Sequence, residues 1–144
     1  MAVKSSIRQI FRKIAEVIAD YVSGEGLERG EIALMGLWNE RTEQVSLTLV
    51  TSRRLSAEDL VRWYRDILNR LRQSVDEPGL PPFTWNIGLV VTSTLDLDRE
   101  FALFSVPDDE EDVTDFLQDE MDAGWPSPSA ASSSPSKVGG SASS

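Results

Sequence analysis

The sequence predicts an α+β fold: a single antiparallel sheet of about four strands with helices packed on it. Two long stretches, residues 6–23 and 55–71, repeat apolar residues at helical spacing. Four shorter stretches alternate, or run apolar throughout, as strands do. The expected element order is α-β-β-α-β-β-α. Two successive αββ units favour one sheet with its helices on one face.

The first three elements follow from local signals. Ser6 is a suitable N-cap, and Gly24 suits the left-handed position that ends a helix. Residues 31–38 are apolar on both faces, which predicts a central strand or one covered on both sides. Residues 44–49 alternate apolar and polar, which predicts a strand with one face in water.

The central helix is the most strongly specified segment. Ser56 is a good N-cap, and Asp59 three residues on resembles a capping box. An apolar stripe then repeats at helical spacing, and it must be buried against another element. Its members are Leu60, Tyr64, Ile67, Leu68 and Leu71, with Trp63 beside them.

Arginines on and just before this helix form the first candidate binding surface. Arginine side chains contact phosphates, so the surface is suited to an anionic partner. The alternative is a solvated face whose long stems cover apolar neighbours, and both interpretations stay open. The candidate residues are Arg53, Arg54, Arg62, Arg65 and Arg72, with Arg70 at the flank.

Two strands are expected in the second half of the chain. Residues 83–92 alternate most clearly, and Arg99 to Val106 is predicted as the fourth strand, ended by Pro107. Between them lies an acidic cluster, Asp96, Asp98 and Glu100. It lacks the further ligands and turn glycine of a calcium loop, so we expect a solvated hairpin tip and no metal site.

The C-terminal quarter of the chain divides into two parts. Residues 1–107 are expected to form the compact domain, 108–125 an acidic amphipathic helical segment, and 126–144 a disordered tail rich in Ser, Pro and Gly. The acidic segment either docks in cis as the last helix, which we favour, or lays its apolar face into a partner's groove. Its candidate partner-binding residues are Asp112, Asp115, Phe116, Leu117, Met121 and Trp125.

Charge is unevenly distributed along the chain. The net charge is −10, and there is no Cys and no His. Residues 1–75 hold twelve Lys/Arg and ten Asp/Glu, whereas residues 76–144 hold two and fourteen. This asymmetry predicts contact between the two halves or two separate partners. One hypothesis is that the acidic segment masks the arginines in cis.

Chemistry-bearing motifs are absent from the sequence. It has no nucleophile elbow, no phosphate-binding loop and no paired carboxylates in an apolar strand. We therefore predict no enzyme, no catalytic residues and no cofactor. No apolar run reaches the length of a membrane span, and no secretory signal is visible, so we expect a cytoplasmic protein without membrane contact.

The element order and acidity resemble two families, the small acidic secretion chaperones and the roadblock-type dimeric scaffolds. Each family has an additional strand that is not found here. The resemblance implies a non-enzymatic homodimer that presents surfaces to other proteins. The predicted function is therefore a protein-interaction module of the adaptor, chaperone or inhibitor type. The alternative is a nucleic-acid-binding protein that contacts phosphates through the arginine face.

Overall fold

The structure is a computed structural model that describes residues 5–74 and 86–126. These ranges leave out the first residues of the strand predicted at 83–92 and nearly all of the tail predicted at 126–144. The described elements are α1 (Ser5–Gly24), the 3-10 helix η1 (Arg29–Glu31), β1 (Ile32–Asn39), β2 (Gln44–Thr51), α2 (Ala57–Gln73), β3 (Asn86–Ser93), α3 (Leu97–Leu103), β4 (Glu111–Asp112) and α4 (Thr114–Gly124).

The protein is α+β, but its four-stranded sheet is mixed. The strand order is β3-β2-β1-β4, with β1 antiparallel to both β2 and β4 and β3 parallel to β2. The predicted purely antiparallel sheet is therefore wrong. The reason is that α2 lies between β2 and β3 as a crossover helix, so the chain starts β3 from the same end as β2.

The segment Arg99 to Val106 is also not the strand that its sequence predicts. Most of it belongs to α3, which Asp96 caps by accepting a hydrogen bond from the Arg99 backbone N–H at 3.1 Å. A capping carboxylate before two further acids stabilises a helix start, and this local signal prevails over the alternation. The fourth strand is β4, which pairs with Leu37 and Trp38 of β1.

Strand β1 is central and covered on both faces, which confirms the prediction for residues 31–38. Leu34 and Trp38 belong to the main core beneath the helices. Ala33 and Met35 are also buried, although they lie outside that core cluster and alternate with its members along the strand. Side chains on both faces of β1 are thus removed from water.

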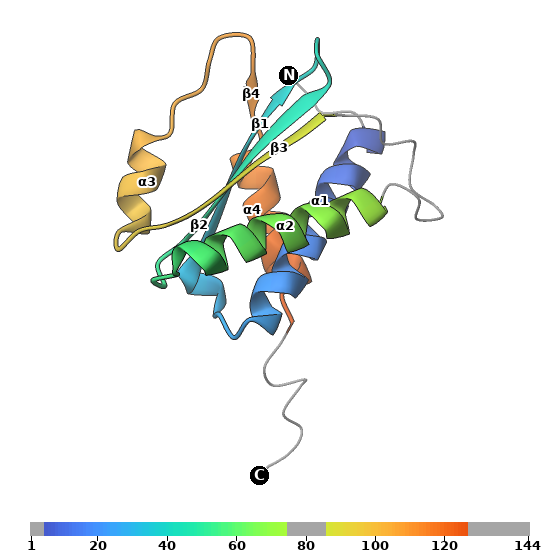
Figure 1. Cartoon of the computed structure of the whole chain (residues 1–144). Coiled ribbons are helices and arrows are strands. Elements are labelled where there is room, and N and C mark those ends of the chain that lie inside the picture. Colours follow the sequence, from blue (N-terminus) through green and yellow to red (C-terminus); the bar gives the residue numbers. More distant parts are fainter. Residues whose placement is uncertain (1–4, 75–85, 127–144) are drawn as a thin grey trace.

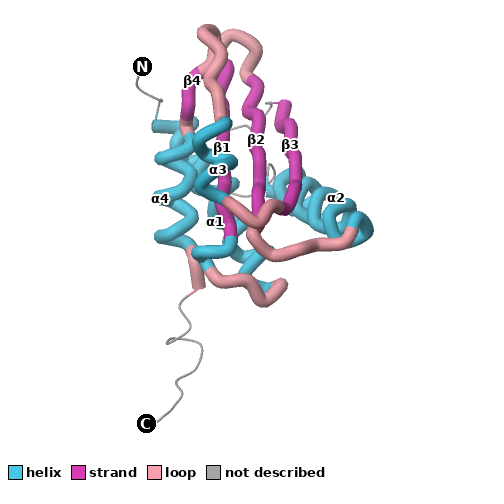
Figure 2. The backbone as a smooth tube through the Cα atoms, turned by 90° about the vertical axis from the view of Figure 1, so that its left-hand side faces the viewer, coloured by secondary structure: helices cyan, strands magenta, loops and turns pink. Residues whose placement is uncertain are grey.

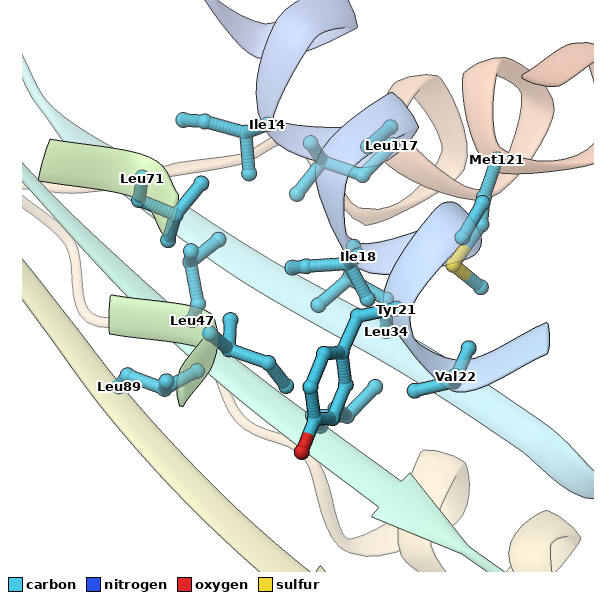
Figure 3. Packing of buried hydrophobic residues seen from close by; sticks show 14 of the residues in the cluster. Ile14, Ile18, Tyr21, Val22, Leu34, Leu47, Leu71, Leu89, Leu117 and Met121 are labelled. Carbon is cyan, nitrogen blue, oxygen red and sulfur yellow. The ribbon is translucent and has the colours of Figure 1, made fainter. Parts of the chain in front are cut away.

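The described helices cover the two faces of the sheet unequally. Helices α1, α2 and α4 cover one face of the sheet, and α3 alone lies on the other (Figures 1 and 2). The main core fills the space under the three-helix layer. Figure 3 shows Ile14 and Ile18 of α1, Leu47 of β2 and Leu117 of α4 converging there.

Helix α2 starts as predicted but buries a different aromatic residue. Ser56 Oγ accepts a hydrogen bond from the Asp59 backbone N–H at 3.1 Å. Trp63 is 1% exposed, whereas Tyr64 is 43% exposed. The buried stripe follows the i, i+4 spacing of Trp63, Ile67 and Leu71, so it excludes Tyr64, which the sequence placed in it.

Helix α4 docks in cis against α1 and β1, as favoured from the sequence. Leu117 and Met121 are fully buried in the main core. The docking point is Gly36: its backbone N–H donates to Thr114 Oγ1 at 3.1 Å, and its carbonyl accepts from the Val113 N–H at 3.0 Å. A Cβ at position 36 would overlap Leu117 Cδ1, so the close approach needs glycine.

Membrane-spanning character is not found in these helices. Across residues 5–74 and 86–126, each helix is too short or too polar to cross a bilayer.

Candidate interaction surfaces

The arginine surface consists of Arg53, Arg54, Arg62, Arg65, Arg70 and Arg72, on α2 and the turn before it. Four of the six arginines form ion pairs with carboxylates of α1, η1, the intervening turn or α2 itself. The N–O distances lie between 2.9 and 3.3 Å, and the pairs are Arg53–Glu31, Arg62–Glu25, Arg62–Asp59, Arg65–Asp66 and Arg70–Asp20. The arginine surface is therefore largely neutralised from within.

The acidic C-terminal segment does not supply these carboxylates. Its helix α4 instead pairs Glu120 with Arg12 of α1 at 3.1 Å, and Asp122 with Arg29 of η1. Among the described residues, no ion pair joins residues 108–125 to the arginine surface. The hypothesis that this segment masks the arginines is wrong, because its paired carboxylates bind Arg12, Arg29 and Arg41 instead, and α4 packs mainly on α1 and β1.

A polar network joins α1 to α2 at Tyr21. The Tyr21 hydroxyl donates to Asp66 Oδ2 at 3.0 Å and accepts from Arg62 Nη1 at 3.3 Å. Burial, followed by the hydrogen bond to Asp66, raises the pKa of Tyr21 from 10.0 to about 12. The hydrogen bond from Arg62 lowers the pKa of Glu25. The network joins α1 to α2, which indicates a structural role.

Alkaline unfolding should report this network. An unfolded tyrosine loses its proton near pH 10, whereas folded Tyr21 keeps its proton until about pH 12. The stabilisation is therefore fully present below pH 10 and is lost as pH rises through 12. We expect the free energy of unfolding, measured by urea titration, to fall across this window. The free energy of unfolding of Tyr21→Phe should fall less across the same window. An equal fall in both proteins would contradict the raised pKa of Tyr21.

The residues predicted to bind partners in the acidic segment are mostly occupied within the chain. Leu117 and Met121 are fully buried, and Phe116 and Trp125 are partly buried against the core. Their apolar side chains cover α1 and β1. The two acids remain accessible: Asp115 is exposed in the first turn of α4, and Asp112 is exposed while accepting a hydrogen bond from the Thr114 N–H at 2.9 Å.

The most exposed apolar area was not identified from the sequence. Seven large apolar side chains are exposed among the described residues, and five of them fall within residues 90–106. The other two, Val61 and Tyr64, lie on α2. We call the five the outer surface, because they lie on β3, α3 and the segments flanking α3, away from the three-helix layer (Figure 2). They are Val90, Leu95, Phe101, Leu103 and Val106.

The outer surface has a strongly acidic border. Residues 96–112 contain eight carboxylates and a single basic residue, Arg99. Only Asp109 among these carboxylates has an ion pair within the described ranges, with Arg41 at 3.6 Å. No group of three or more potential metal ligands is found in the described part of the chain. We call these eight carboxylates the acidic border, and their charge is largely uncompensated. Asp96, Asp98 and Glu100 lie at α3, whereas Glu111 and Asp112 form β4 at the sheet edge opposite β3.

Two open depressions lie on the surface, and the second includes acids from residues 96–112. One, of about 550 Å³, is formed by α2 residues from Ala57 to Arg65. The other, of about 390 Å³, lies between Trp38, the turn at Glu40 and Arg41, and the acids 108–111. Both are shallow surface features lined mainly by charged side chains, unlike the mostly apolar clefts that bury small ligands.

Comparison of the chain with protein-family models, curated proteins and solved structures finds no match.

Proposed function

We propose that this protein is a non-enzymatic protein-interaction module that binds a partner protein through the outer surface. One observation carries the proposal: five large apolar side chains, exposed by 37 to 85%, lie within seventeen consecutive residues, 90–106. Exposed apolar side chains are ordinary when scattered, but their concentration beside a polar rim is typical of a protein–protein contact.

The arginine surface supports a binding role less well. Its six arginines lie among six carboxylates of α1, η1, the turn between them and α2, so it carries little net positive charge. The carboxylates are Asp20, Glu25, Glu31, Glu58, Asp59 and Asp66. Binding of a polyanion gains its energy from phosphate neutralisation, which cis pairing of the arginines weakens. Nucleic-acid binding through the arginine surface stays a prediction, and the pairing of its arginines within the chain makes that binding less favourable.

Charge also bears on the predicted homodimer. A two-fold dimer places the same patch of each copy against itself. Through the outer surface, this arrangement would bring together two acidic borders of eight carboxylates and one arginine each. Such like charges repel at close range. The proposed partner of the outer surface is therefore a different protein, in keeping with an adaptor, chaperone or inhibitor role.

Site-specific photo-crosslinking tests the proposal. A photoreactive phenylalanine analogue replaces Leu103 in one full-length protein and Val61 in another, and each is irradiated in extract from its native source. The two sites are 66% and 64% exposed, so they differ in location and not in accessibility. We expect a discrete protein adduct from position 103 and none from position 61. No adduct at 103, or equal adducts at both sites, would contradict the proposal.

A further inference from the structure

We infer that the partner presents a cationic amphipathic helix to the outer surface, lying beside α3 on the exposed face of the sheet. This inference rests on the proposed function and specifies the chemistry of its partner. Three features of the described residues carry it: a half-covered parallel strand pair, a floor of small side chains, and an acidic border with few counter-charges.

The parallel pair β2–β3 lacks a complete outer layer. Parallel strands are normally covered by helices on both faces. On the inner face, α2 packs against β3 and the main core. On the outer face, α3 contacts β1 and β2 only lightly and buries none of its own residues. Val90 of β3 remains 56% exposed there. Among residues 5–74 and 86–126, α3 thus covers part of the outer face over β1 and β2 and leaves a strip along β3 uncovered.

The floor of this strip is made of small side chains. Val45, Leu47 and Leu89 point into the main core, so the residues alternating with them face outward. The outward positions include Ser46, Thr48 and Gly88, which are all partly exposed. A Cβ added at Gly88 would meet only a backbone oxygen, at 4.0 Å. Such a floor lets a helix approach closely, and Val90 supplies an apolar contact at its centre.

The acidic border determines the charge of the helix. Asp96 caps α3 and Asp98 is exposed in its first turn, while Arg99 is the sole basic residue from 96 to 112. A partner helix with lysine or arginine beside its apolar stripe would neutralise this border while covering Leu103. An acidic helix with the same stripe would be repelled. Charge therefore selects among amphipathic helices that are otherwise alike.

Defined peptides test this inference with the full-length protein. The probe is a fluorescent Leu/Lys amphipathic peptide of about 18 residues, long enough to form a helix on binding. The counter-probe replaces each Lys with Glu. Binding is followed by fluorescence anisotropy at low and moderate salt. We expect the Leu/Lys peptide to bind, more weakly at higher salt, and the Leu/Glu peptide not to bind.

Matched variants locate the binding site. Leu103→Asn should weaken Leu/Lys binding by about five- to tenfold, as expected for one apolar contact of an interface, and Val61→Asn should leave it unchanged. Asp98→Asn should weaken binding about two- to fivefold and flatten the salt dependence, whereas Glu58→Gln should not. Asp98 and Glu58 both lie in first helical turns, so their effects on helix stability are alike. Circular dichroism confirms that each variant is folded.

Three outcomes would overturn the inference: no binding of the Leu/Lys peptide, equal binding of both peptides, or equal effects of Leu103→Asn and Val61→Asn. They are distinguishable from failure of the proposed function. If the adduct at position 103 forms while the Leu/Lys peptide fails to bind, the outer surface binds a protein of other chemistry. If both are negative, the proposed function fails as well.

Discussion

Trp63→Ala is expected to destabilise the protein by about 3–5 kcal/mol, the usual cost of removing a large buried aromatic side chain. Trp63 is 1% exposed and is among the largest side chains that are fully buried. Its ring meets that of Tyr21 edge to face, with centroids 6.0 Å apart, so it joins α2 to α1. The alanine variant would leave a cavity where two helices meet the sheet. Urea unfolding followed by far-UV circular dichroism measures the loss.

The neighbouring residue supplies the control for this prediction. Tyr64→Ala removes an aromatic side chain from the same helix turn, but Tyr64 is 43% exposed, so we expect a cost below about 1 kcal/mol. Trp63→Phe should cost less than Trp63→Ala, because phenylalanine refills most of the volume that alanine leaves empty. Similar costs for Trp63→Ala and Tyr64→Ala would mean that α2 does not pack with Trp63 inward.

Gly36→Val is expected to loosen α4 and destabilise the protein by about 1–3 kcal/mol, the typical cost of overpacking a well-packed core. A side chain at this position would overlap Leu117 and press on Val113, whose Cγ2 would lie 3.3 Å from the new Cβ. Valine favours strands, so a loss of stability would show that overlap outweighs propensity. Hydrogen exchange should show faster exchange in α4, and thermal unfolding should show a lower Tm.

Two further variants isolate the cause at Gly36. Gly30→Val places the same side chain where no atom lies within 4 Å of the added Cβ, and it should have a small effect. Leu117→Ala removes the overlapping side chain, so Gly36→Ala should cost less in that background than in the wild-type protein. If Gly36→Ala costs the same free energy of unfolding in both backgrounds, the overlap with Leu117 is not the reason that position 36 requires glycine.

The parts of the fold that could be predicted are those determined by residues close together in the sequence. The Ser56 cap and the two apolar faces of residues 31–38 depend on neighbours within a turn or a strand, and the structure confirms both. The direction of β3 relative to β2, in contrast, could not be predicted from local sequence. An alternating strand has the same pattern whether its neighbour is parallel or antiparallel, so the sequence could not show that α2 crosses over the sheet.

The candidate surfaces also depend on contacts between residues that are far apart in the sequence. Arginines on α2 could be counted from the sequence, but Glu25 and Asp20 lie 37 and 50 residues before the arginines that they pair with. The stripe of Leu117 and Met121 did indicate docking in cis. The outer surface went unrecognised because residues 99–106 were assigned to the sheet, which would have buried alternate side chains that α3 leaves exposed.

The packing of α1 against α4 has a consequence for how the protein is made. Helix α1 ends at Gly24, and α4 begins only at Thr114. At ~5–20 residues per second, a ribosome needs roughly 5–18 s to cover that distance. Throughout that interval, Ile14 and Ile18 have emerged without the Leu117 and Met121 that help to enclose them. The core of the nascent chain therefore stays incomplete until α4 leaves the ribosome, and until then the apolar stripe of α1 lacks part of its cover.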